Sequence, residues 1–175
     1  KLTDWANANN ISSVDAHDAL ADCHLMKELT KIVKDNIKEA WDASLKGSSK
    51  HGNLALIQSE PFAMLGEVIR KQKFSYPIVY CGQNLKLTNE VAVLDLYYDP
   101  NILNEMTDSE LLENIGINGT AIRKVKINRS LPLISSTKVK KLESFLDIEI
   151  IELERRSKYI RANIQLQQRI SELIT

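Results

Sequence analysis

The residues best suited to chemistry in this chain lie at positions 15–24, which read Asp-Ala-His-Asp-Ala-Leu-Ala-Asp-Cys-His. They place one histidine and three acids within eight residues, where a helix is expected to begin. Asp15 is predicted to be the N-cap, with Asp18 complementing the first amides and an apolar-periodic run from Leu20 to about Val33. On composition alone this pattern favours a surface helix with acids at its positive end, and a catalytic or metal-binding site is the alternative.

The spacing of His17 and Asp22 restricts how the two could act together. Five residues advance about 500° around a helix, so two helical side chains would point about 140° apart. A shared site therefore requires His17 to lie on the loop or first turn before the helix that carries Asp22. Asp18 and Asp22 are four residues apart and form an alternative pair that could hold a divalent metal. Spacing alone leaves both arrangements open.

Composition limits the class of protein but names no partner. The 175 residues suffice for one domain or two small ones, and 43% apolar and 26% charged residues are typical of a soluble globular protein. Because the net charge is zero, only local clusters of charge can indicate a nucleic-acid partner. No apolar run approaches the ~18 residues of a membrane span, so we expect no membrane partner. The two cysteines form no disulfide framework, which predicts a reducing cytoplasm.

The pattern of elements predicts two domains. Residues 46–53 are rich in Gly, Ser and Lys and predict a linker, with the boundary between about 42 and 53. Beyond it, short β-branched or aromatic runs predict a small barrel or curled sheet: 64–70, 76–81, 91–98 and 122–128. Thr107 and Glu110 have the form of a capping box. From Ser136 the pattern is helical, with Asp147 predicted as a cap between helices.

Basic residues cluster in two stretches of the second region. Residues 70–76 mix cations with Phe74 and Tyr76, a combination that binds single strands by charge and stacking, although both rings could instead be core residues of a strand. Residues 121–141 have no acid, which suits a phosphate backbone but also a strand edge protected by lysine. This second stretch holds seven cations: Arg123, Lys124, Lys126, Arg129, Lys138, Lys140 and Lys141.

Residues 17–22, His-Asp-Ala-Leu-Ala-Asp, resemble the third exonuclease motif, His-x-Ala-x-x-Asp, of the DEDDh 3′→5′ exonucleases. A longer string, from Lys1-Leu2 through Ala8-Asn9 and Ile11 to Asp22, is similar to the exodeoxyribonuclease I family in particular. Residues 125–133, Val-Lys-Ile-Asn-Arg-Ser-Leu-Pro-Leu, also resemble a segment of that family. The two matches occur in the family's order and bracket most of the chain.

The resemblance implies an α+β fold in two parts. Residues 1–45 would be the C-terminal part of an RNase H-like α/β exonuclease domain. Residues 46–175 would be a small SH3-like β-barrel domain with C-terminal helices. The implied reaction, in DNA repair and recombination, is hydrolysis of single-stranded DNA from its 3′ end to nucleoside 5′-monophosphates. The family uses two Mg²⁺ ions held by four acids.

The resemblance also assigns roles to residues. His17 matches the general base, and Asp22 matches the last of the acids and is a metal ligand in this interpretation. Lys1 aligns with a basic position that contacts substrate. Resemblance and charge clusters together predict contacts with single-stranded DNA by Lys1, Lys73, Tyr76, Arg123, Lys124, Lys126 and Arg129.

The first two acidic motifs of the family do not occur upstream of residues 17–22 in this chain. We therefore expect a fragment of an enzyme that is inactive alone and binds no Mg²⁺ alone, yet still contacts single-stranded DNA. The intact enzyme is expected to be a monomer with single-strand-binding protein as a partner. Two alternatives remain: a non-catalytic module that binds single-stranded nucleic acid, and a protein-interaction module.

Overall fold

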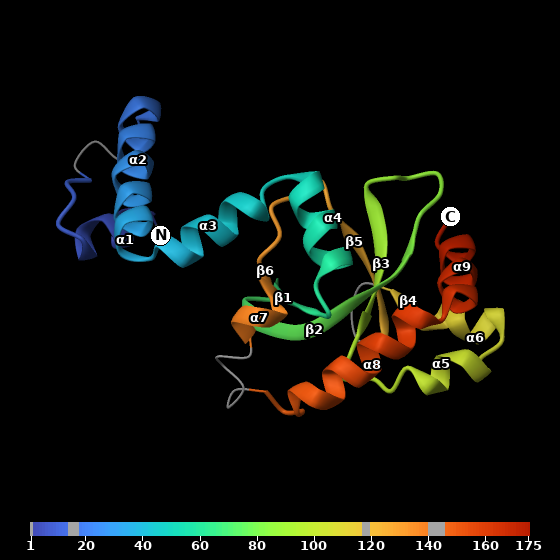
Figure 1. Cartoon of the computed structure of the whole chain (residues 1–175). Coiled ribbons are helices and arrows are strands. Elements are labelled where there is room, and N and C mark those ends of the chain that lie inside the picture. Colours follow the sequence, from blue (N-terminus) through green and yellow to red (C-terminus); the bar gives the residue numbers. More distant parts are fainter. Residues whose placement is uncertain (1, 14–17, 117–119, 140–145) are drawn as a thin grey trace. The chain divides into compact units, whose positions relative to one another are not determined.

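The computed structural model describes residues 2–13, 18–116, 120–139 and 146–175 (Figure 1). The chain divides into two compact units, Lys1–Ala43 and Ser44–Thr175. None of the described helices is both long enough and apolar enough to cross a membrane.

The first unit is built on two helices, α1 (Leu2–Ala8) and α2 (Ala19–Asn36). Its small core contains Ala6, Leu25 and Leu29. Asp18 is the N-cap of α2, and one of its carboxylate oxygens accepts hydrogen bonds from the amides of Leu20 and Ala21, each at 3.1 Å. The prediction that Asp15 caps this helix was therefore wrong: the first orphan amides are satisfied by Asp18, while Asp15 lies outside the described residues.

Two helices occupy the region where the sequence predicted a linker, α3 (Lys38–Lys46) and α4 (Lys50–Ser59). The hydroxyl of Ser49 caps α4 by accepting a hydrogen bond from the amide of Gly52 at 3.0 Å. Glycine is required at 52 because a Cβ there would lie 2.0 Å from the carbonyl oxygen of Lys46. The linker prediction was wrong for residues 50–53: Gly and Ser here allow a tight turn and a cap between helices.

The second unit is organised around a six-stranded sheet in the order β4-β5-β3-β2-β1-β6. All its strand pairs are antiparallel except β4–β5. Its strands are β1 (Ala63–Ile69), β2 (Gln72–Gln83), β3 (Glu90–Asp95), β4 (Ile115–Gly116), β5 (Ile122–Lys126) and β6 (Leu133–Ser135). The fold is thus mixed α+β, as the sequence predicted.

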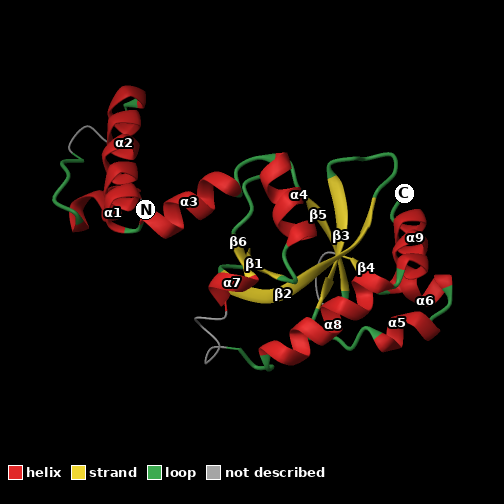
Figure 2. Cartoon of the chain, in the orientation of Figure 1, coloured by secondary structure: helices red, strands yellow, loops and turns green. Residues whose placement is uncertain are grey.

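The central strand β3 is buried along its whole length, so both faces of the sheet are covered. Its residues alternate between two cores, as the pleat requires. Val91 and Val93 belong to a core that includes Ile57 of α4. Ala92 and Leu94 belong to a second core that α8 (Ile150–Ala162) and α9 (Ile164–Leu173) complete. Figure 2 shows α4 and α8 on opposite sides of the strands.

Short helices lie between the strands and before the C-terminal pair. They are α5 (Asn101–Glu105), α6 (Asp108–Glu113) and α7 (Ser136–Val139). The capping box predicted at Thr107 and Glu110 is confirmed, with the amide of Thr107 donating to Glu110 at 2.8 Å. The N-cap of α8 is Glu149 rather than the predicted Asp147.

Arginine side chains of α8 fix this helix by donating to backbone carbonyls that follow β3 and to others at the end of α4. Arg156 donates to the carbonyls of Leu96 at 2.9 Å and Tyr97 at 3.0 Å. Arg161 donates to the carbonyl of Gln58 at 2.6 Å and to that of Glu60, at the end of α4. The bonds from Arg161 satisfy carbonyls that the end of α4 leaves without an intrahelical partner.

The hairpin between β1 and β2 turns through Arg70 and Lys71, whose φ angles are +50° and +69°. A two-residue turn with both φ angles positive normally takes Asn and Gly, because side chains with an ordinary Cβ are strained there. The turn therefore places two cations at positions that cost stability.

Replacing this turn by Arg70→Asn with Lys71→Gly is expected to stabilise the chain by about 1 kcal/mol, because the left-handed strain is relieved. Chemical denaturation with an unchanged m-value would measure the gain. The paired exposed changes Lys27→Asn and Lys34→Asn provide a control for the loss of charge. A loss of stability in the turn variant would contradict the conformation described for Arg70 and Lys71.

The two cysteines should differ in reactivity. Cys23 is exposed, whereas Cys81 is buried among the strands, and burial raises the pKa of its thiol. A thiol reagent at neutral pH is expected to modify Cys23 in the folded chain and both cysteines after denaturation. Rapid modification of a Cys23→Ser variant under native conditions would contradict this placement of Cys81.

Candidate functional site

Asp22 lies on the first turn of α2 and is half-buried, with its amide donating to the carbonyl of Asp18 at 2.9 Å. The carboxylate of Asp18 is engaged as the helix cap, which disfavours the alternative metal pair of Asp18 with Asp22. No group of three or more His, Cys, Asp or Glu among the described residues could hold a metal ion. Lys1 and His17 lie outside the described residues, so their predicted roles remain predictions.

Arg123 on β5 lies in a charged cluster on the same sheet face as α4. Its guanidinium is 3.3 Å from a carboxylate oxygen of Asp95 and 3.5 Å from one of Glu67. The guanidinium carbon also lies 3.9 Å from the centre of the Tyr76 ring, a cation–π contact. Side-chain exposure is only 11% for Arg123 and 6% for Asp95, so this is an internal ion pair.

Burial is the largest influence on the pKa values of the acidic groups Asp95 and Tyr76 in this cluster. Burial raises the pKa of Asp95, although the amide of Tyr97 and the guanidinium of Arg123 act in the opposite direction. Burial also raises the pKa of the Tyr76 hydroxyl, and the neighbouring Glu67 raises it further. Tyr76 is 4% exposed and belongs to the core, so its ring is not available for stacking on a base. The cluster therefore has a structural role in the sheet.

The acids that face Arg123 are not among the residues predicted from the sequence. Asp95 ends the apolar strand β3, and Glu67 is a lone acid in the otherwise apolar middle of β1. An acid in a buried strand usually has a cationic partner, which is the signal that could have identified the pair. The register between β3 and β5 determines which cation becomes the partner of Asp95. Arg123 lies opposite Val93 on β3, two residues from Asp95.

The other predicted DNA contacts that the structure describes are exposed, in contrast to Tyr76 and Arg123. Lys124 and Lys126 alternate with Arg123 along β5 and point to the opposite face of the sheet, toward solvent. Arg129 is exposed in the connection that follows β5. Lys73 is exposed on the hairpin, where Phe74 rather than Tyr76 is the accessible ring, at 44% exposure.

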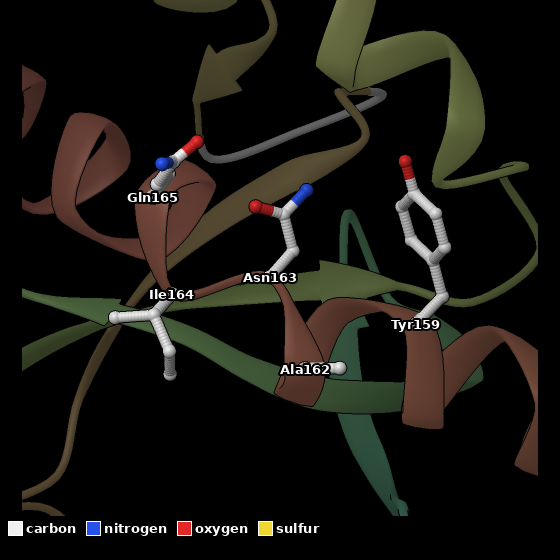
Figure 3. Close-up of a pocket in the computed structure, with 5 residues that line it drawn as sticks. All are labelled: Tyr159, Ala162, Asn163, Ile164 and Gln165. Atoms are coloured by element: carbon white, nitrogen blue, oxygen red, sulfur yellow. The ribbon is translucent and has the colours of Figure 1, made fainter.

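An open pocket of about 440 Å³ lies where α8 meets α9 (Figure 3). Its lining residues are Tyr159, Ala162, Asn163, Ile164 and Gln165. Asn163 caps α9 by accepting from the amide of Leu166 at 3.1 Å and donates to Asn104 at 3.0 Å. The Tyr159 hydroxyl is the only titratable side-chain group among these lining residues, and the side chain of Asn163 is already engaged in hydrogen bonds. The pocket is therefore not the predicted site.

Removal of the Arg123 charge should destabilise the fold. Arg123→Leu is expected to lower the free energy of unfolding by about 3 kcal/mol, because it leaves the buried Asp95 without its cation. Adding Asp95→Asn should recover part of the loss, and Lys124→Leu should change stability by less than about 0.5 kcal/mol. Urea unfolding of these variants tests the assignment, and equal effects at Arg123 and Lys124 would contradict it.

The chain is similar to known exodeoxyribonucleases in both sequence and structure, although no family model matches it. Exodeoxyribonuclease I of Buchnera aphidicola from Acyrthosiphon pisum is 25% identical over 97% of this chain and 43% of that protein. The corresponding protein of the strain from Schizaphis graminum is 28% identical over 66% of this chain and 22% of that protein.

Solved structures show the same fold. Exonuclease I of Escherichia coli in complex with a dA16 oligonucleotide aligns with a TM-score of 0.73 and 21% identity, covering 99% of this chain and 40% of that one. Exonuclease I of Methylocaldum szegediense aligns with a TM-score of 0.70 and 20% identity, over 100% of this chain and 40% of that one. The chain spans less than half the length of the relatives that it matches. Nearly all of this chain thus resembles a part of exodeoxyribonuclease I, which confirms the resemblance first indicated by residues 17–22 and 125–133.

Proposed function

We propose that this chain is part of a single-strand-specific 3′→5′ exodeoxyribonuclease that acts in DNA repair and recombination. The observation that carries the proposal is similarity to exodeoxyribonuclease I over 97% of the chain, in which the His-x-Ala-x-x-Asp spacing of residues 17–22 is also present. A non-catalytic binding module or a protein-interaction module would not require that spacing. The exonuclease therefore remains the favoured interpretation.

In this proposal the two units contribute different parts of the enzyme. Residues 1–45 are the end of the RNase H-like exonuclease domain, and residues 46–175 are the SH3-like domain with its helices. His17 is the general base that takes a proton from the attacking water, a task suited to a group that titrates near neutral pH. Asp22 is one carboxylate ligand of the catalytic metal.

The described residues do not fit a complete metal site, because they include no cluster of three ligands around Asp22. Two Mg²⁺ ions would need further carboxylates, and we propose that other parts of the intact enzyme supply them. The 175 residues alone are then expected to be inactive. A hard cation such as Mg²⁺ is consistent with a carboxylate ligand at Asp22.

Single-stranded DNA is the proposed substrate and partner. Solved structures similar to this chain include E. coli exonuclease I with a dA16 oligonucleotide and an ExoI/SSB-Ct complex, which support DNA and single-strand-binding protein as partners. The proposed DNA contacts are Lys1, Lys73, Lys124, Lys126 and Arg129. Tyr76 and Arg123 are not included, because the Tyr76 side chain is buried in the core and Arg123 is held in an internal ion pair. We also propose that the intact enzyme is a monomer and acts in the cytoplasm.

The catalytic assignment can be tested in the longer enzyme that carries this chain. His17→Ala and Asp22→Asn are each expected to lower 3′→5′ cleavage of labelled oligo-dT at least 100-fold, because a base or a metal ligand is lost. The dissociation constant of the oligonucleotide should change little. Asp18→Asn, which retains a helix cap, provides the matched control.

Cleavage by the Asp22→Asn enzyme at the unmodified rate would refute the assignment of Asp22. Cleavage by the 175 residues alone with Mg²⁺ would refute the proposal that other carboxylates are required.

A further inference from the structure

Three connections that are distant in sequence meet at one end of the second unit. They are the beginning of α4, the turn between β2 and β3, and the connection between β5 and β6, which lie together at the upper end in Figure 1. The ammonium of Lys50 donates to the hydroxyl of Thr88 at 3.3 Å. The amide of Ile127 donates to the carbonyl of Asn89 at 2.9 Å, and that of Leu131 donates to Gly47 at 3.0 Å.

The buried side chain of Asn53 joins the beginning of α4 to the connection between β5 and β6. It is fully buried in α4, and its amide nitrogen donates to the carbonyls of Ile127 at 2.9 Å and Arg129 at 2.8 Å. The β2–β3 turn is ordered by Asn84, whose side-chain oxygen accepts from the amides of Lys86 at 3.0 Å and Leu87 at 2.8 Å. The three connections therefore form a defined surface.

The three connections themselves carry cations and no acids. Residues 44–53, 84–89 and 124–133 contain no Asp or Glu, although the whole chain has zero net charge. Glu90, which is paired with Lys126 across the strands, is buried and accepts a hydrogen bond from Asn84 at 3.2 Å. We call this surface the cationic end, defined by Lys46, Lys50, Lys86, Lys126 and Arg129, all of which are exposed except the half-buried Lys50.

The chemistry of the cationic end fits a polyanion with apolar groups between its charges. Several ammonium and guanidinium groups without acids attract a phosphate backbone. Leu85 and Leu87 flank Lys86 and are 66% and 55% exposed, so the β2–β3 turn also offers apolar surface to bases. Both faces of the central strand β3 are excluded, because its residues are buried against helices and their cores.

We propose that the cationic end binds the backbone of single-stranded DNA, with Lys50 and Lys86 as contacts in addition to Lys126 and Arg129. This inference rests on the proposed function for the choice of DNA. The proposed DNA contact thus lies on a surface made by three connections. The basic stretch at residues 121–141 supplies only part of that surface.

The test measures binding of fluorescein-labelled oligo-dT to the complete 175-residue chain by anisotropy, at salt concentrations between about 50 and 200 mM, the range in which counterion release changes affinity strongly. The variant Lys50→Gln/Lys86→Gln/Lys126→Gln removes three charges from the cationic end. The control Lys27→Gln/Lys34→Gln/Lys158→Gln removes three exposed charges elsewhere, so both proteins have the same net charge. Thermal unfolding confirms that both variants are folded.

The cationic-end variant is expected to bind at least tenfold more weakly at the lowest salt. The slope of log affinity against log salt should fall by about 2, since each lost phosphate contact on a single strand contributes about 0.7. The control variant should retain the slope of the unmodified chain. Equal slopes for the two variants, or no binding by the unmodified chain, would overturn the inference.

Either of those results leaves the proposed exonuclease function standing, because that function is tested by cleavage in the longer enzyme. Conversely, a salt-dependent loss in the cationic-end variant supports the inference even if the Asp22→Asn enzyme still cleaves DNA. Binding of poly-glutamate more tightly than oligo-dT at the same salt would also overturn the inference, and would assign the cationic end to an acidic protein segment.

Discussion

Burial of β3 on both faces is the constraint on which the second unit depends. All six residues from Glu90 to Asp95 are buried, so each face of the sheet must carry its own core. On one face α4 supplies Ile57, and on the other α8 and α9 supply a larger apolar surface. A charged group can then lie near the middle of the sheet only if it is paired, as Arg123 is with Asp95.

That constraint separates residues that look alike in the sequence. Arg123 and Lys124 are neighbours in the same basic stretch, yet the pleat directs the first to an internal ion pair and the second to solvent. Phe74 and Tyr76 differ in a related way, because Tyr76 lies opposite Leu65 inside the core and Phe74 lies nearer the hairpin tip. The cationic side chains that a ligand can reach therefore lie at the ends of the strands and in the connections between them.

Sequence reasoning predicted the features that depend on local patterns. The apolar period of α2, the capping box at Thr107 and the short strands needed only neighbouring residues. The features that it missed depend on distant contacts. The beginning of α4, residues 50–53, was interpreted as linker because the hydrogen bonds of Asn53 reach residues 127 and 129. The cationic end was missed for the same reason, since the connections that carry Lys50 and Lys86 come together only after the sheet forms. The catalytic interpretation came from a resemblance at residues 17–22, of which residue 17 lies outside the described part of the chain.

We propose that single-stranded DNA contacts the ends of the strands and leaves the buried strand β3 untouched. Backbone amide spectra of the ¹⁵N-labelled chain, recorded during titration with unlabelled oligo-dT, would locate the contact residue by residue. We expect the largest chemical-shift changes at residues 46–53, 84–89 and 126–131, with little change at Tyr76 and Arg123. Changes concentrated on α8 and α9, or on the strand residues around Arg123, would contradict it.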